Sequence, residues 1–245
     1  MPADPDGDVL IVGAGIGGLA AALALAARGV NVRVLEASSQ PGGKAGTVAV
    51  DGVVIETGPS VLTLPEVFAG LFARAGLRLD EVVGLRRLDP GFRYRWADGC
   101  VLDVAHDPEQ TLANVRQSLG PGAEADLASF LRYSRRIWDA AAPHFVLGPA
   151  PTWTAMAGLA VRHPRALLAV DPLSSMAAGI DRHVADPHLR VLLRRYATYN
   201  GSDPRKAPAT LNCIAHIELS LGGFGSVLGA LVAGLLIGEI GRAHV

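Results

Sequence analysis

The chain has 245 residues, of which 50% are hydrophobic, so it can bury a sizeable core in one large domain or two ordinary ones. Its formal net charge of −1 at pH 7 gives no reason to expect a nucleic-acid partner. The two cysteines, Cys100 and Cys213, and the scattered histidines lack metal-ligand spacing. We therefore predict reduced thiols, no metal site and a cytoplasmic location.

Residues 8–36 predict a strand–helix–strand unit near the N-terminus. A short apolar run at 9–12 ends in a glycine-rich turn, which leads into an Ala/Leu-rich helix. A β-branched run at 31–35 follows, and the acidic residue Glu36 stands at its end.

The turn has the spacing GxGxxG, and each glycine has a physical reason. Gly13 permits the tight turn, Gly15 lets the backbone approach a pyrophosphate, and Gly18 lets the helix lie close to the sheet. The helix N-terminus offers N–H groups to phosphates, and the Glu36 carboxylate can accept hydrogen bonds from ribose hydroxyls. This pattern predicts a dinucleotide site; the alternative is a doubly wound sheet whose first turn is merely glycine-rich.

Two more glycine-rich loops follow. The loop after Glu36 contains Gly42, Gly43 and Lys44, which favours an extended FAD over a nicotinamide nucleotide, although a plain glycine turn is the alternative. Residues 48–54 predict a hairpin that turns at Asp51-Gly52. Residues 55–60 then predict a second close approach of the backbone.

The pattern becomes mostly helical after residue 106. Before it, Thr63 to Glu66 forms a capping-box pattern that opens a helix to about residue 75, and residues 92–104 predict a hairpin. Further helix starts are predicted at four positions, namely Asp107, Ala123, Asp186 and Asp203. We therefore expect a nucleotide-binding domain at 1–105, a helical domain at 106–225 and a separate tail at 226–245.

The charges are unevenly distributed along the chain. Residues 132–206 hold 11 Lys or Arg against 5 Asp or Glu, whereas residues 1–131 hold 10 against 16. Such a basic stretch is typical of solvated helix faces, and the sharper interpretation is contact with an anionic membrane surface.

The motifs together resemble a known family. The glycine motif with Glu36, the segment 41–45 and the segment 56–60 resemble the N-terminal region of FAD-dependent amine-oxidase-like proteins, most closely bacterial-type carotenoid (phytoene) desaturases. The stretches 195–210 and 216–218 are similar to the subgroup that acts on hydroxy- or methoxyneurosporene. The resemblance covers residues 8 to about 224.

The resemblance implies an α/β fold, with a Rossmann-like FAD-binding domain, a largely helical substrate domain and a truncation before the C-terminal return to the FAD domain. It implies FAD as cofactor, a lipophilic acyclic carotenoid as substrate and peripheral attachment to the membrane. Arg135 is a candidate polar partner of the substrate, with a solvated helix face as the alternative. The implied cofactor-binding residues are Gly13, Gly15, Ile16, Gly17, Gly18, Glu36, Ala37, Gly42, Gly43, Lys44, Gly58, Pro59 and Ser60.

The C-terminal stretch departs from the family pattern. Residues 239–245 resemble a translated sequencing adapter, so we expect a truncated gene product with an artificial tail. The uncharged run at 219–238 has the length of a membrane span, but its glycines weaken that interpretation. Three other readings stay open: an amine or protoporphyrinogen oxidase relative, a nicotinamide-dependent dehydrogenase, and an inactive FAD-binding fragment.

Overall fold

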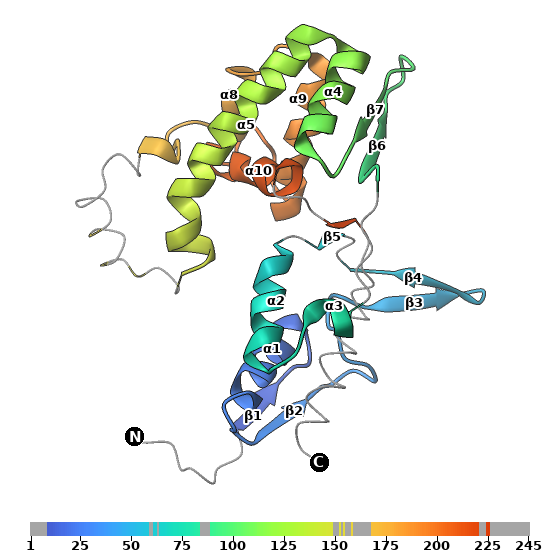
Figure 1. Cartoon of the computed structure of the whole chain (residues 1–245), viewed down its shortest axis with the longest axis vertical. Helices are drawn as coiled ribbons and strands as arrows, with labels where there is room; N and C mark the ends of the chain where they lie inside the picture. The colour runs from blue at the N-terminus through green and yellow to red at the C-terminus, as the bar shows by residue number, and fades with distance from the viewer. Residues whose placement is uncertain are drawn as a thin grey trace. The chain divides into compact units, whose positions relative to one another are not determined.

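A computed structural model divides the chain into two compact units, residues 1–88 with 224–245, and residues 89–223 (Figure 1). The structure describes residues 9–58, 61–62, 64–83, 89–148, 152, 154, 158, 168–220 and 224–225.

The first unit begins with the predicted strand–helix–strand element. Strand β1 (Val9–Val12) pairs in parallel with β2 (Val32–Leu35), and helix α1 (Ile16–Ala26) connects them. The parallel pairing requires the helical crossover that the sequence predicts. The buried residues that hold this unit together come from the turn, from α1 and from the region 72–83: Ala14, Leu19, Ala22, Leu23, Phe72, Leu79 and Val83.

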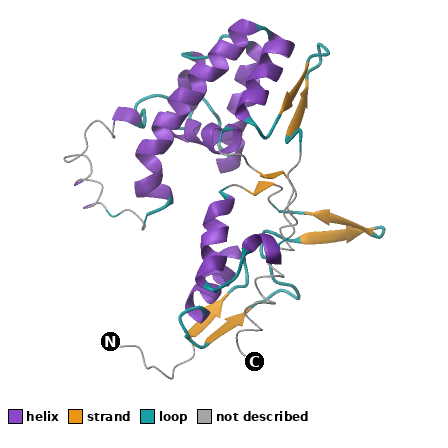
Figure 2. Ribbon diagram, in the orientation of Figure 1, coloured by secondary structure: helices purple, strands orange, loops and turns teal. Residues whose placement is uncertain are grey.

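The remaining strands of the first unit form small antiparallel pairs (Figure 2). The predicted hairpin is confirmed as β3 (Thr47–Val50) paired with β4 (Val53–Glu56). Asp51 and Gly52 have φ of 50° and 80°, the left-handed conformation that a two-residue type I′ turn requires. Strand β5 (Val61–Leu62) pairs with β8 (Phe224–Gly225), a pairing that the sequence pattern did not predict.

Two helices complete this unit, α2 (Pro65–Arg74) and the short α3 (Leu79–Val82). The predicted capping box is wrong in its N-cap position, because the N-cap of α2 is Leu64 and no side chain caps the helix there. Pro65 instead occupies the first turn, where the missing N–H costs nothing.

The second unit packs helices against a hairpin. Strands β6 (Phe92–Arg95) and β7 (Val101–Val104) form the hairpin predicted at 92–104. The helical elements are α4 (Pro108–Leu119), α5 (Pro121–Ala141), the π-helix η1 (Ala142–Val146), α8 (Met176–Asp181), α9 (Pro187–Arg194), the 3₁₀ helices η2 (Arg195–Asn200) and η3 (Ala209–Asn212), and α10 (Cys213–Leu219).

The contacts place the hairpin with the helices, so the division falls at residue 88 rather than at the predicted 105. The reason is burial: Leu102 and Val104 of β7 belong to the same core cluster as Phe130 and Ile137 of α5. A boundary drawn where strands give way to helices misses this packing.

The predicted helix starts have different outcomes. Asp107 and Asp186 are N-caps whose carboxylates accept hydrogen bonds from the N–H groups of Glu109 and Leu189, at 3.0 and 2.9 Å, which confirms both starts. Helix α5 begins at Pro121, two residues before the predicted Ala123.

The helix start predicted at Asp203 is wrong. Residues 204–206 form a turn instead, in which the N–H groups of Lys206 and Ala207 donate to the Asp203 carbonyl.

Among the helices in the described part of the chain, none is both long enough and apolar enough to cross a bilayer. The predicted tail at 226–245 lies outside the described residues, and so does most of the uncharged run at 219–238.

Candidate functional site

The glycine turn between β1 and α1 is held tightly against both elements. Gly13 has φ of 100° and donates its N–H to the Leu35 carbonyl at 2.7 Å, which ties the turn to the end of β2. A Cβ at Gly18 would lie 2.0 Å from the Gly13 carbonyl oxygen. Both positions therefore require glycine, the first for its conformation and the second for the close approach of helix and turn.

The N-terminus of α1 is open. Gly15 is its N-cap with an extended backbone, no side chain caps the first turn, and that turn carries no acidic residue. The first N–H groups of a helix have no partner within it, and the helix dipole adds partial positive charge at the same end. This end of α1 is suited to receive an anion such as a diphosphate.

The Glu36 carboxylate faces the same turn. It accepts hydrogen bonds from the Ala14 N–H at 2.7 Å and the Ser38 N–H at 2.9 Å. Both bonds lower the pKa of Glu36, the bond from Ser38 having the larger effect, and they keep the carboxylate ionised. A carboxylate has about four acceptor positions, so oxygens held in this way can still accept from ribose hydroxyls.

The loop after β2 packs directly on the glycine turn. Gly42 donates its N–H to the Ala14 carbonyl at 2.8 Å and forms a parallel bridge with Gly15. A Cβ at Gly43, where φ is 58°, would lie 3.1 Å from the Gly15 Cα. The two glycine segments therefore form one surface of nearly bare backbone.

The third glycine segment joins the second. A Cβ at Gly58 would lie 2.2 Å from the Lys44 carbonyl oxygen, so only glycine fits there. Thr57 donates its N–H to the Gly46 carbonyl at 3.0 Å and fixes the same contact. The structure thus brings together three glycine segments that are up to 45 residues apart in the sequence.

Of the predicted cofactor residues, all but two are described. Those in the glycine turn lie with Glu36 and Gly42 as above, and Ala37 and Lys44 are exposed beside them. Pro59 and Ser60 lie outside the described residues. Arg135 lies on the exposed face of α5, where its Nε is 3.5 Å from Asp139 Oδ2 and its side chain is 70% exposed.

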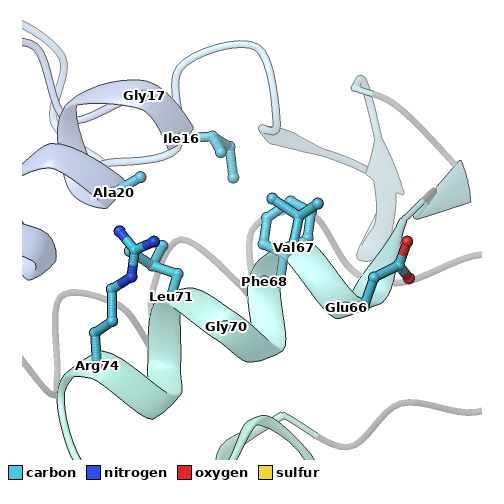
Figure 3. A pocket seen from close by; sticks show the side chains of 9 residues that line it. All are labelled: Ile16, Gly17, Ala20, Glu66, Val67, Phe68, Gly70, Leu71 and Arg74. Atoms are coloured by element: carbon cyan, nitrogen blue, oxygen red, sulfur yellow. The ribbon is translucent and has the colours of Figure 1, made fainter. Parts of the chain in front are cut away.

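A shallow, mainly apolar groove of about 540 Å³ runs between α1 and α2 (Figure 3). Ile16 and Gly17 line its α1 side, and Val67, Phe68 and other α2 residues line the opposite side. Glu66 and Arg74 stand at opposite ends of the α2 wall (Figure 3). The groove borders the open helix end without closing it.

The second unit contains a buried ionic network that the sequence did not reveal. The Glu218 side chain is 1% exposed and accepts from Arg195 Nη2 at 2.7 Å. The Tyr196 hydroxyl donates to the same Glu218 oxygen at 3.0 Å, and the Tyr199 hydroxyl donates to the other. Both oxygens are therefore satisfied, as a buried carboxylate requires.

Aromatic rings enclose the Arg195 guanidinium. Its central carbon lies 4.7 Å from the ring centre of Tyr196 and 5.5 Å from that of Tyr199. From β6, Phe92 and Tyr94 approach at 5.5 and 5.7 Å. Tyr196 and Tyr199 thus donate hydrogen bonds to the carboxylate of this ion pair and place their rings beside its guanidinium.

The first unit fits a flavin dinucleotide on three independent observations. The helix end is uncapped, the glycine segments form a cradle that a Cβ would obstruct, and an ionised carboxylate stands at the adjoining strand end. Among the described residues, no group of His, Cys, Asp and Glu could hold a metal ion.

Comparison with known proteins gives the same picture. Residues 16–236 match the family model described as flavin-containing amine oxidoreductase, a match that ends inside the predicted 226–245 tail. The chain is 35% identical over 215 residues to the 4,4'-diapolycopene oxygenase of Methylomonas sp, covering 87% of this chain and 43% of that protein. It is 37% identical over 213 residues to the hydroxyneurosporene desaturase of Rubrivivax gelatinosus, covering 86% of this chain and 41% of that protein.

Solved structures share the fold. Cyclohexylamine oxidase from Brevibacterium oxydans matches with a TM-score of 0.58 and 22% identity, over 97% of this chain and 50% of that one. Putrescine oxidase matches with a TM-score of 0.53 and 21% identity, over 96% and 49%. The chain thus spans about half the length of the proteins it matches.

The predicted fold class, the resemblance to carotenoid desaturases and FAD as the cofactor are confirmed by these matches. The chain belongs to the family of flavin-containing amine oxidoreductases.

Proposed function

We propose that this protein takes part in the FAD-dependent desaturation of an acyclic carotenoid, with a neurosporene derivative as the specific substrate. The observation that carries the proposal is the contact of the ionised Glu36 carboxylate with the glycine turn, at the open end of α1. The similarity to a hydroxyneurosporene desaturase at 37% identity supports the carotenoid class.

The cofactor would lie along the glycine segments. The N–H groups at the start of α1, at Ile16 and Gly17, would hold the diphosphate, and Glu36 would bind the ribose. Gly42, Gly43 and Lys44 would contact the extended cofactor along the second loop, and Gly58 would hold that loop in place through its contact with Lys44. Ala37, Pro59 and Ser60 complete the proposed set.

When bound, the flavin supplies a two-electron acceptor. It would thereby supply the oxidant for removing a hydride and a proton from neighbouring carbons of a saturated C–C unit, which leaves a double bond, the proton passing to solvent or a base. The role of this chain would be to position the cofactor. The glycine cradle would hold the cofactor in place, so that the reacting carbon of the substrate can be oriented against it. Arg135 stays a proposed polar partner of the substrate.

We infer that the working enzyme is longer than this chain. Its curated relatives are more than twice the matched length, since the matches cover 43% and 41% of them. The two-stranded sheet leaves apolar side chains exposed, with Val12 82% and Leu10 54% accessible. Parallel strands are normally buried on both faces, so further chain would be needed to cover them.

A cytoplasmic location with peripheral attachment to the membrane fits this function. A carotenoid is a bilayer solute, and the enzyme must receive it from there. The excess of basic residues in 132–206 is suited to an anionic leaflet.

The test pairs this chain with the complementary C-terminal part of a full-length relative. We expect the co-purified complex to retain FAD and to lengthen the conjugated system of an acyclic carotenoid, seen as a red shift in its absorption. Amines serve as the comparison substrates. A flavin-loaded complex that oxidises amines and leaves the carotenoid unchanged would refute the carotenoid assignment, and a complex that never retains FAD would refute the site.

A further inference from the structure

The 89–223 unit has a pocket of its own, of about 420 Å³, which the proposed flavin chemistry does not use. Its polar lining comes from α5, from the segment before α8 and from the end of α8. The residues concerned are Tyr133, Arg136, Asp171, Arg182 and His183.

One wall of the pocket is rigid because Asp171 holds it. The Tyr133 hydroxyl donates to Asp171 Oδ2 at 2.7 Å, and the Arg182 guanidinium pairs with the same oxygen. The Asp171 side chain is 16% exposed, whereas that of Arg182 is 51% exposed, so the carboxylate is the sheltered partner of this pair. Asp171 therefore holds Tyr133 and Arg182 in position, and Arg182 neutralises the charge of the Asp171 carboxylate.

Arg136 adds a positive charge that no acid in the described part of the chain balances. Among the described residues, no carboxylate lies within ion-pair distance of Arg136, and the same holds for Arg132 one turn earlier on α5. The side chains of i and i+4 share one face of a helix, so both guanidinium groups serve the same side of α5.

His183 contributes a neutral donor. Burial lowers its pKa, and the positive charges of Arg182, Arg136 and Arg132 lower it further, so the ring is uncharged at neutral pH. Its Nδ1 lies 3.1 Å from the Ser129 hydroxyl oxygen, and its ring stacks on Tyr133 at 4.7 Å between centres. If Nδ1 accepts from Ser129, Nε2 carries the proton and can donate to a ligand.

We propose that this pocket binds the phosphodiester of an anionic phospholipid, with Arg136 as its main contact and Arg182 and His183 as supporting donors. A planar guanidinium matches two phosphate oxygens at once, which a point charge cannot do. An exposed apolar side chain in the lining favours a lipid over free phosphate, because Leu168 of this pocket is 73% exposed. The proposal rests on the peripheral membrane attachment proposed above and gives it a location.

The experiment measures co-sedimentation of the 245-residue chain with phosphatidylcholine vesicles, with and without phosphatidylglycerol. We expect the anionic lipid to increase binding and Arg136→Gln to reduce it by about tenfold, more than the roughly fivefold loss of one surface charge. Arg136→Lys keeps the charge and loses the planar fork, so it should also bind more weakly than the wild type. Arg116→Gln, in the same unit, removes an equal charge from an exposed pair with Glu124, so it should lose no more than the roughly fivefold expected of one surface charge.

The possible failures are distinct. Wild-type binding by Arg136→Gln would overturn the site while leaving membrane attachment intact. Full binding by Arg136→Lys would overturn the specific phosphodiester contact, because any positive charge at this position would then be sufficient. No vesicle binding by the wild type would overturn the membrane attachment together with the site. Inorganic phosphate that binds without vesicles in an Arg136-dependent way would overturn the choice of a lipid. FAD retention and carotenoid conversion are measured separately, so none of these results bears on the desaturase proposal.

Discussion

The carboxylate of Glu36 and the backbone N–H of Ala14, 22 residues apart in the chain, are joined by a hydrogen bond of 2.7 Å. This bond connects the end of β2 to the turn after β1, and it orients the acid toward the open end of α1. The same residue therefore stabilises the turn and would contact a bound nucleotide.

Replacing Gly18 by alanine should destabilise the first unit. Its Cβ would lie 2.0 Å from a backbone oxygen, so turn and helix would have to separate, at a cost of about 3 kcal/mol. Thermal unfolding followed by circular dichroism measures the loss. The matched control is Gly17→Ala, where a Cβ meets nothing within 4 Å and stability should change by less than about 1 kcal/mol. Equal melting temperatures for the two variants would contradict the packing argument.

Stability of the first unit should fall in acid because of Glu36. Its pKa is lowered in the folded state, so its contribution is present above the ordinary glutamate pKa of about 4.3 and is lost as the pH falls below that value. Denaturant unfolding between neutral and acidic pH should show a smaller decrease for Glu36→Gln than for the wild type. Glu66→Gln, an exposed change in the same unit, serves as the comparison.

Removing Glu218 should damage the second unit severely. Glu218→Ala leaves Arg195 and two tyrosine hydroxyls without their acceptor, which for a buried ion pair costs about 3–5 kcal/mol. The exposed pair of Arg116 and Glu124 provides the contrast, since Glu124→Ala should cost less than about 1 kcal/mol. Urea unfolding of both variants compares them directly, and similar midpoints would mean that the buried network contributes little.

All four tyrosines should resist ionisation until the chain unfolds. Burial raises the pKa of Tyr133 and Tyr199 to about 12, raises that of Tyr94, and raises that of Tyr196 further. Because the folded pKa values lie above the unfolded value, this contribution is complete below about pH 10 and is lost as the pH rises toward 12. Spectrophotometric titration should show little tyrosinate at pH 10 in the native chain and much more in denaturant. Titration at pH 10 without denaturant would contradict the shielding of these hydroxyl groups from water.

The dinucleotide site could be predicted from the sequence because its geometry is local. The spacing of Gly13, Gly15 and Gly18 determines the turn, and Glu36 follows the strand that must pair with β1. The hairpin at Asp51-Gly52 is determined in the same way by two residues with positive φ.

The buried network could not be predicted because it depends on contacts between distant segments. Arg195 and Glu218 are 23 residues apart, and Tyr94 comes from a hairpin a hundred residues earlier in the printed numbering. The only local signal was an arginine followed by two tyrosines within η2. The helix start predicted at Asp203 failed because the prediction used a local signal alone. Asp203 is a suitable N-cap residue, but the segment after it forms a turn and does not continue as a helix.

The β3–β4 hairpin affects how the chain behaves at high concentration. Val53 and Val54 are 61% and 64% exposed, and Val48, Val50 and Ile55 are each nearly half exposed, so in the described part of the chain this two-stranded ribbon exposes apolar side chains on both faces. Such a ribbon can add strands from neighbouring molecules along its outer edges, which pair with no other strand of the described residues. Intermolecular β-aggregation should therefore start at this hairpin, and a lysine at Val54 would be the first change to try for keeping the purified chain in solution.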